Sequence, residues 1–193
     1  MASFRHTMMV NLGEVPADSA WRSGFGTPLR NQLERFARDA REAEAMRSTY
    51  VEFHDIHHDR MVEAYPGIRD ALEDLRGPSI TLGIVTSKNR RAMRRGLQLC
   101  GLDGYFNACV TVDDVNEFKP HPAPVIAALD QLSADAGETV FIGDSPHDMV
   151  AGRAAGVRTA AVLWGPFSRE VLARQAPDYW LTHPTEISSL PRS

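Results

Sequence analysis

The sequence predicts an α/β fold with a parallel sheet, preceded by a separate helical unit. Two observations support this prediction. From about Gly67 onward, short apolar runs bounded by turn residues alternate with stretches of helical periodicity, which is typical of a parallel sheet covered by helices on both faces. Before Pro66 the periodicity is helical and no good strand is visible. We therefore expect two domains, a helical unit over residues 1–65 and an α/β unit over residues 66–193.

The helical unit is expected to contain three helices. Their expected ranges are a first helix through about Asn11, a second from Thr27 to about Ala37 and a third from about Asp39 to Glu63. Thr27 suits the N-cap of the second helix, because a threonine hydroxyl can accept a hydrogen bond from the first turn. Pro28 suits its first helical position, where a missing N–H leaves no partner unsatisfied.

The α/β unit is expected to open with a helix and to continue with five strands that alternate with helices. In such sheets ligands bind beyond the carboxyl ends of the strands, so functional residues are expected there. The expected order is helix Ile68 to Arg76, strand Ile80 to Val85, helix Arg90 to Cys100, strand Ala108 to Val112, helix Ala123 to Leu132, strand Thr139 to Ile142, helix Pro146 to Ala155, strand Arg158 to Leu163, helix Arg169 to Arg174 and strand Tyr179 to Leu181.

Composition argues against several kinds of protein. The 193 residues are 43% hydrophobic, enough for a real core. The apolar runs are far shorter than the ~20 residues that span a bilayer, and the N-terminus has no apolar signal-peptide core, so we expect a cytoplasmic protein without a membrane partner. A net charge of -4 with scattered arginines argues against a nucleic-acid partner. Cys100 and Cys109 fit neither a metal site nor a disulfide framework.

The lysines are the most selective feature of the composition. Of 21 basic residues, only Lys88 and Lys119 are lysines. In a chain so biased toward arginine, a lysine marks a position where a planar guanidinium does not replace a compact ammonium. Lys119 is followed by Pro120 and Pro122, which hold the chain extended and delay the next helix. Its ammonium therefore has a rigid mount, whereas the sequence assigns no role to Lys88.

Hydroxyl and carboxylate groups follow two of the expected strands. Thr86 and Ser87 precede a helix, where amide donors and the helix dipole favour an anion such as phosphate; the alternative is that one of them only caps the helix. Asp144 lies at a strand end beside a glycine and is a plausible ligand for Mg²⁺. Asp148 falls in the next helical turn, where it can orient Lys119 or a metal-bound water. The alternative for this turn is a simple helix cap.

Three segments, in this order, resemble motifs of the haloacid dehalogenase-like phosphatases. They are Gly83-Ile84-Val85-Thr86-Ser87-Lys88, Lys119-Pro120-His121-Pro122 and Gly143-Asp144-Ser145-Pro146-His147-Asp148, and residues 96–102, 110–115 and 151–157 look like the pyrophosphatase and phosphoglycolate phosphatase branch. The resemblance implies a Rossmann-like core with residues 1–65 as a helical cap. It implies that Thr86, Lys119 and Asp148 are catalytic, that Thr86, Ser87 and Lys119 bind phosphate, and that Asp144 binds Mg²⁺.

Two features of the expected cap invite interpretation. The resemblance suggests that Gly24-Phe25-Gly26-Thr27 is a loop over the active site in which Gly24 and Thr27 help to select the substrate; a turn with a helix cap is the alternative. His54 and His58 lie one helical turn apart within the cluster His54–Asp59, a spacing that can bind metal. Because the cluster lacks the glutamate of a zincin motif, we expect a solvated helix face instead.

The chain departs from the family at its first motif, because Asp-x-Asp occurs nowhere in the 193 residues. In the family, a central strand carries these aspartates; the first attacks phosphorus and the second protonates the leaving group. Asp103-Gly104 reads as a turn, and Asp113 and Asp114 would point to opposite faces of a strand, so neither replaces the motif. Without that strand, a gap of about 10 Å is expected between the strands that end before Thr86 and Asp144.

Three explanations of the missing motif stay open. The start is late or the chain is truncated, so that the cap is incomplete at its N-terminus; the chain is a degenerate relative; or a neighbouring molecule supplies the strand.

The resemblance implies a Mg²⁺-dependent phosphatase of a small phosphorylated metabolite, of phosphoglycolate or pyrophosphate type, acting through an aspartyl-phosphate. The literal 193-residue chain is expected to be inactive. A catalytically dead phospho-ligand-binding relative and a sugar-phosphate mutase are the alternatives, and substrate and oligomeric state are undetermined.

Overall fold

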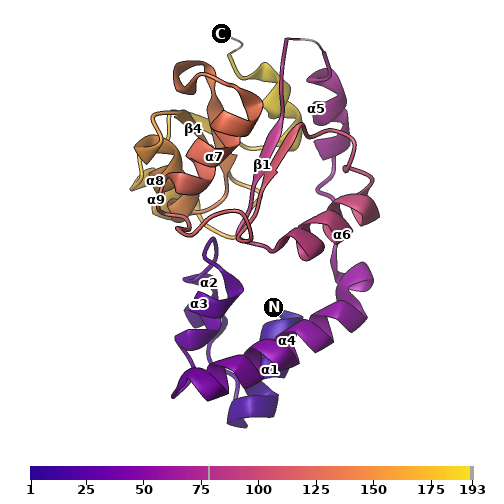
Figure 1. Cartoon of the computed structure of the whole chain (residues 1–193), viewed down its shortest axis with the longest axis vertical. Coiled ribbons are helices and arrows are strands. Elements are labelled where there is room, and N and C mark those ends of the chain that lie inside the picture. The colour runs from indigo at the N-terminus through magenta and orange to yellow at the C-terminus, as the bar shows by residue number, and fades with distance from the viewer. Residues whose placement is uncertain (78, 192–193) are drawn as a thin grey trace. The chain divides into compact units, whose positions relative to one another are not determined.

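The computed structural model describes residues 1–77 and 79–191. The chain divides into two compact units, Met1–Glu63 and Ala64–Ser193, and each is described by itself (Figure 1). No helix in the described ranges is both long and apolar enough to cross a membrane.

The N-terminal unit consists of helices packed around an aromatic core. Phe4 of the first helix stacks on Trp21 with ring centroids 4.4 Å apart, and Met8, Leu33 and Met46 complete the buried cluster. Burial of these large side chains holds together helices that are too short to be stable alone. The helices are α1 (Ala2–Leu12), α2 (Asp18–Arg22), α3 (Leu29–Glu34) and α4 (Ala40–Met61).

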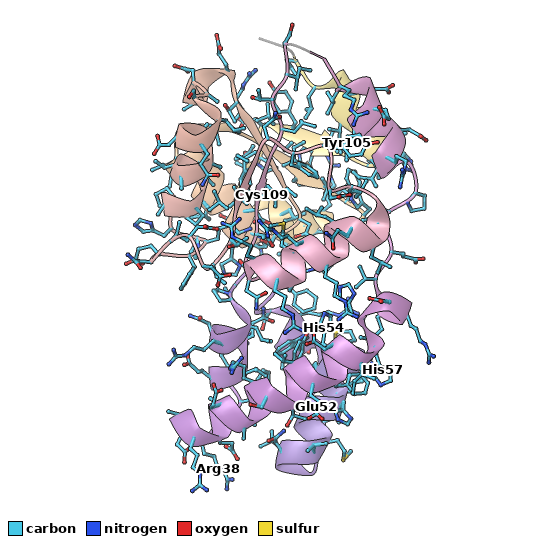
Figure 2. All side chains as sticks on the ribbon, turned by 45° about the vertical axis from the view of Figure 1, so that its right-hand side comes forward. Arg38, Glu52, His54, His57, Tyr105 and Cys109 are labelled. Carbon is cyan, nitrogen blue, oxygen red and sulfur yellow. The ribbon has the colours of Figure 1, made fainter. Side chains whose placement is uncertain are left out.

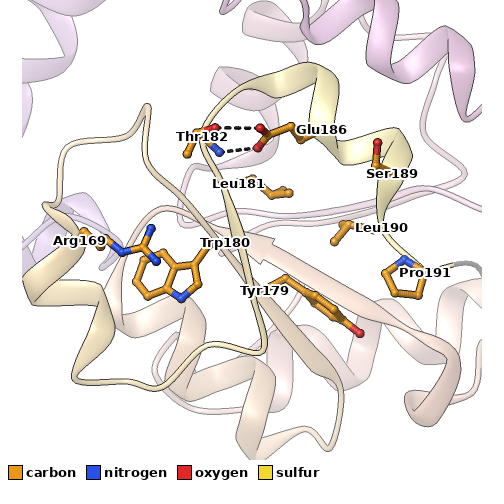
Figure 3. A pocket seen from close by; sticks show the side chains of 9 residues that line it. All are labelled: Arg169, Tyr179, Trp180, Leu181, Thr182, Glu186, Ser189, Leu190 and Pro191. Carbon is orange, nitrogen blue, oxygen red and sulfur yellow. Dashed lines mark hydrogen bonds between the residues drawn. The ribbon is translucent and has the colours of Figure 1, made fainter.

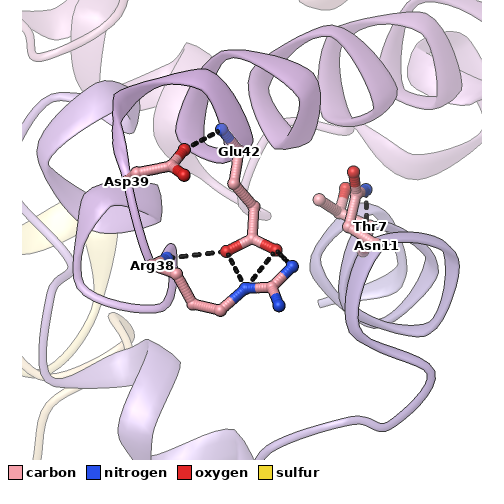
Figure 4. A network of polar contacts seen from close by, with 5 residues as sticks. All are labelled: Thr7, Asn11, Arg38, Asp39 and Glu42. Atoms are coloured by element: carbon pink, nitrogen blue, oxygen red, sulfur yellow. Dashed lines mark hydrogen bonds and ion pairs between the residues drawn. The ribbon is translucent and has the colours of Figure 1, made fainter.

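The long helix α4 begins at a local polar network, shown in Figure 4. The Asp39 side chain accepts a hydrogen bond from the Glu42 amide at 2.8 Å. Glu42 in turn accepts from the Arg38 amide at 2.6 Å and from the Arg38 guanidinium at 2.6 Å. The Glu42 amide, which the first turn leaves without a helical partner, is satisfied in this way, so α4 starts close to the expected Asp39.

Three expectations for this unit were wrong. Thr27 does not cap α3: the N-cap position is Pro28, and the Thr27 hydroxyl donates to the Gly24 carbonyl at 2.7 Å, closing the preceding loop instead. The helix also ends at Glu34, earlier than predicted. The expected solvated face around His54 is wrong for His58, which is only 2% exposed.

The histidines of α4 form part of an aromatic ladder rather than a polar face. The rings of His54 and His58 meet edge to face with centroids 5.2 Å apart, and Tyr50 stacks on His54. His57 packs instead on Phe53, with ring centroids 4.4 Å apart. Figure 2 shows His54 and His57 on α4. The buried His58 ring combines this packing with a polar contact, since its Nδ1 lies 2.8 Å from Oδ1 of Asp59.

The C-terminal unit has the expected alternation of helices and parallel strands. Its strands form two parallel ladders, as predicted. In one, β1 pairs with β2; in the other, β4 lies in the middle and pairs with β3 on one side and β5 on the other. The elements are α5 (Ile68–Asp74), β1 (Gly83–Val85), α6 (Arg90–Cys100), β2 (Ala108–Val110), α7 (Ala123–Leu132), η1 (Ala136–Glu138), β3 (Val140–Gly143), α8 (Pro146–Ala154), β4 (Arg158–Val162), α9 (Arg169–Ala173), β5 (Tyr179–Leu181) and η2 (Pro184–Ser189).

Helices cover both faces of the larger ladder. Met149 of α8 and Leu172 of α9 pack with Ala161 on one face. Ala71 of α5 and Ile187 of η2 pack with strand residues on the other. Strands buried on both faces read as continuous apolar runs, which explains why they were recognisable in the sequence.

Strand β1 is shorter than the predicted Ile80–Val85. The Leu82 amide donates to the Asn107 side chain at 3.1 Å, and the Leu82 carbonyl accepts from the Asn107 amide at 2.7 Å. A side chain therefore substitutes for the backbone ladder before Gly83. Asp113 and Asp114 lie in the turn directly after β2 and not on a strand, which corrects the expected geometry of that pair.

No ladder joins β1 to β3 among the described residues. The two strands nevertheless share one apolar cluster, in which Val85 of β1 and Phe141 of β3 pack with Val125 of α7 and Ala151 of α8. In Figure 1, α7 lies beside β1. Packing through α7 and α8 thus holds the two ladders in one unit.

The outer strand β5 borders a groove of about 630 Å³ (Figure 3). The Glu186 carboxylate accepts from the Thr182 amide at 2.6 Å and from its hydroxyl at 2.8 Å, next to the capping box with His183 that begins η2. The groove is lined by Arg169, Tyr179, Trp180, Leu181, Thr182, Glu186, Ser189, Leu190 and Pro191.

Candidate active site

The predicted site residues of the α/β unit follow the carboxyl ends of its strands. Thr86 comes directly after β1, Lys119 lies in the segment between β2 and α7, Asp144 comes directly after β3 and Asp148 lies in the first turn of α8. Parallel strands bring their carboxyl ends to the same side of a sheet, which is where ligand sites occur in this class of fold.

A buried ion pair between Lys119 and Asp148 is the centre of the site. The Lys119 ammonium donates to Oδ1 of Asp148 at 2.7 Å, and the two side chains are 8% and 7% exposed. The ammonium also donates to the Val85 carbonyl at 3.2 Å, at the end of β1. Lys119 therefore links the carboxyl end of the first ladder to the helix that follows the second, next to Thr86.

Asp148 is fixed from a second side by Ser145. Oδ2 of Asp148 accepts from the Ser145 amide at 3.0 Å and from the Ser145 hydroxyl at 2.6 Å, while the Ser145 oxygen accepts from the Asp148 amide. This is a capping box, which begins α8. The helix-cap alternative for the turn is thus correct for Ser145, and Asp148 serves both the cap and the ion pair.

Gly143 allows the end of β3 to pass directly over Asp148. A Cβ atom at position 143 would lie 2.3 Å from the Cβ of Asp148 and 2.7 Å from its Cγ. No residue with a side chain fits there without moving the carboxylate. Sequence reasoning offered a cap for this turn without naming the capping box and gave no role to Gly143; the Ser-x-x-Asp spacing before α8 was the signal for the box.

Asp144 is a partly buried carboxyl group beside the ion pair. Burial, and then the nearby negative charge of Asp148, raise the pKa of Asp144 to about 6, against a smaller opposing effect of Lys119. The site thus holds two carboxylates and one ammonium in a poorly solvated region. An ionised Asp144 lacks full compensation by this unit, and a divalent cation would supply it.

The remaining predicted residues have distinct positions. The Thr86 amide pairs with the Val110 carbonyl, and its hydroxyl oxygen accepts from the Lys88 amide at 3.2 Å. Neither Thr86 nor Ser87 caps α6, because the N-cap is Asn89, so that alternative is wrong. Gly24 and Thr27 lie in the loop before α3 of the N-terminal unit, where the Thr27 hydroxyl donates a hydrogen bond to the Gly24 carbonyl.

The donor set fits a hard cation with few protein ligands. Within residues 1–77 and 79–191, no group of three or more His, Cys, Asp or Glu side chains is arranged to hold a metal. Mg²⁺ is commonly bound by one or two carboxylates, with water and substrate phosphate filling its other positions. Asp144 offers such a carboxylate, whereas Asp148 already accepts from Lys119 and Ser145.

Comparisons with known proteins agree with this fold. Residues 1–162 match the model of the haloacid dehalogenase-like hydrolases. The chain is 40% identical over 166 residues to the pyrophosphatase PpaX of Anoxybacillus flavithermus, covering 86% of this chain and 76% of that protein. These matches show that the chain belongs to the haloacid dehalogenase-like hydrolase family.

Solved structures share the same architecture. A candidate phosphoglycolate phosphatase from Lactobacillus plantarum superimposes with a TM-score of 0.84 at 25% identity, over 98% of this chain and 89% of that one. A candidate β-phosphoglucomutase from Thermotoga maritima superimposes with a TM-score of 0.75 at 22% identity, over 98% and 88%, and shows the fold alone. The family match shows a haloacid dehalogenase-like hydrolase, and the names pyrophosphatase and phosphoglycolate phosphatase are those of its relatives.

Proposed function

We propose that the site is the phosphate-binding half of a Mg²⁺-dependent phosphatase that acts on a small phosphorylated metabolite, of phosphoglycolate or pyrophosphate type. The observation that carries this proposal is the buried Lys119–Asp148 pair beside Asp144, at the carboxyl ends of β1 and β3. Carboxyl groups whose pKa is shifted by burial and by a charged neighbour cluster at functional sites. The names of the relatives supply the substrate classes.

Each residue has a part in this proposal. The Lys119 ammonium, oriented by Asp148 and by the Val85 carbonyl, offsets the negative charge of a phosphoryl oxygen. Thr86 and Ser87, between β1 and the N-terminus of α6, donate hydrogen bonds to the same group. Asp144 holds Mg²⁺, which when bound neutralises charge on the transferring phosphoryl group.

The nucleophile of the proposed reaction is not among the 193 residues, which contain no Asp-x-Asp. Hydrolysis through an aspartyl-phosphate therefore needs an aspartate from outside them, and we propose that the 193-residue chain alone binds phosphate and Mg²⁺ without turnover. The arrangement of β1 and β3 supports this idea. Among the described strands, none pairs with both of them and they do not pair with each other, although both contribute side chains to one apolar cluster. A strand inserted there would end beside Lys119.

A chimera tests the proposal. The N-terminal strand of the Anoxybacillus flavithermus relative, which that protein's uncovered portion is expected to contain, is joined to Met1, and phosphate release is followed with pyrophosphate and phosphoglycolate. We expect release by the chimera with Mg²⁺ and none by the 193-residue chain. Lys119→Ala and Asp144→Asn in the chimera should abolish release. Full activity in either variant would refute the assignment.

The same experiment separates the two alternatives. A catalytically dead phospho-ligand-binding protein, favoured by the absence of Asp-x-Asp, would bind phosphate but remain inactive even as the chimera. A sugar-phosphate mutase would move phosphate between positions of a hexose rather than release it into water. Incubating the chimera with glucose 1-phosphate and assaying both glucose 6-phosphate and free phosphate distinguishes these outcomes.

A further inference from the structure

Gly165 lies in the loop between β4 and α9, in close contact with Asp144. A Cβ atom at position 165 would lie 2.4 Å from the Cβ of Asp144 and 3.1 Å from both its Cγ and its Oδ2. Carbon atoms in ordinary contact are about 3.5 to 4.0 Å apart. The loop backbone therefore approaches Asp144 more closely than any residue with a side chain would allow.

Asp144 has little freedom to withdraw from such an atom. Its Cβ belongs to the backbone turn between Gly143, whose Cα packs against Asp148, and Ser145, whose hydroxyl caps α8. The conflict would be with a Cβ, so rotation of the Asp144 side chain does not relieve it. Moving Asp144 means moving the capping box that orients Asp148.

The loop is equally constrained. The Leu163 amide donates to the Leu181 carbonyl at 2.9 Å, just before Gly165. Trp164 packs on the cluster that contains Ala160 and Val162, and Phe167 packs on the cluster of Met149, Ala161 and Leu172. Anchors on both sides of Gly165 therefore press the loop against Asp144.

We propose that Gly165 is a positioning residue for Asp144: its bare backbone forms one wall of the carboxylate's site, and any side chain there displaces the carboxylate. Restoring ordinary contact from 2.4 Å requires a movement of about 1 Å. Displacements of that size are enough to impair a metal site. The consequence for Mg²⁺ rests on the proposed function, whereas the steric coupling between Gly165 and Asp144 does not.

Magnesium titration of the 193-residue chain is the first test. Gly165→Ala should raise the Kd for Mg²⁺, measured by isothermal titration calorimetry, by about 10- to 100-fold. Replacing a residue that orients a metal ligand typically weakens metal binding by this factor. Gly96→Ala is the matched control, because Gly96 lies in α6 with no atom within 4 Å of its added Cβ. It should leave the Kd unchanged. An unchanged Kd in Gly165→Ala would overturn the proposal.

Thermal unfolding without metal is the second test and does not depend on function. Gly165→Ala should lower the Tm of the chain, but should not lower it further in an Asp144→Gly background, where the opposing Cβ is gone. An equal decrease in both backgrounds would overturn the positioning role. If the unsubstituted chain binds no Mg²⁺ while the Tm coupling is found, the proposed metal site fails and the positioning role stands.

Discussion

Replacing Asp144 by asparagine should stabilise the metal-free protein at neutral pH. Burial and the charge of Asp148 raise the pKa of Asp144 from 3.8 to about 6. At neutral pH this carboxyl is ionised in both the folded and the unfolded chain, so the whole difference of about 2 pKa units opposes folding. At 1.36 kcal/mol per unit, this amounts to about 3 kcal/mol, which asparagine removes.

The pH dependence has a definite sign. Between about pH 4 and about pH 6 the folded chain keeps a proton on Asp144 that the unfolded chain has lost. The contribution of Asp144 to the free energy of unfolding therefore falls as the pH rises through this window and stays low above it. Asp144→Asn has no such proton, so the advantage of the variant should grow from about zero near pH 4 to about 3 kcal/mol near pH 7.5.

Urea unfolding followed by tryptophan fluorescence across this pH range measures the difference. Asp103→Asn is the control, because Asp103 is an exposed aspartate in a turn, and it should change the free energy of unfolding at neutral pH by less than about 0.5 kcal/mol. Added Mg²⁺ should stabilise the unsubstituted chain but not Asp144→Asn. A variant that is no more stable than the unsubstituted chain at neutral pH, or a difference that does not change with pH, would refute the reasoning.

Two further substitutions test the site. Lys119→Met leaves Asp148 buried without its cation and should lower the free energy of unfolding, measured in urea, by about 3 to 5 kcal/mol. Lys88→Met, at the exposed lysine, is the control and should change the free energy of unfolding by less than about 0.5 kcal/mol. Equal effects of the two substitutions would contradict the burial argument. Ser145→Ala removes the N-cap of α8 and should lower the unfolding free energy by about 1 to 2 kcal/mol, with Ser145→Thr recovering most of it. A Ser145→Ala chain as stable as the original would show that the cap is dispensable.

Local signals in the sequence account for most of the element order. Each of the five predicted strands is found, because apolar runs between turn residues are buried on both faces. Helix α2 was missed, since five residues carry no periodicity and Trp21 holds that helix by packing. Thr27 was misread as a cap because a hydroxyl can bond within its loop as well as to a helix.

The burial of His58 was also beyond sequence reasoning. Histidine is common on polar helix faces, and the sequence around His58 contains charged residues that favour that reading. In the folded unit the His58 ring is buried and meets the His54 ring edge to face. A side chain that is both polar and aromatic carries no local sign of which property its surroundings will use.

The sequence by itself determined the α/β class, the order of helices and strands along the chain, and which side chains are candidates to bind phosphate and Mg²⁺. Periodicity, caps and strand ends depend on residues only a few positions apart. Only the tertiary structure decided how those ligands act on one another. Lys119 and Asp148 are 29 positions apart, yet their side chains meet at 2.7 Å. The raised pKa of Asp144 and its contact with Gly165 likewise arise from burial and close approach, which exist only once the strands and their loops have packed.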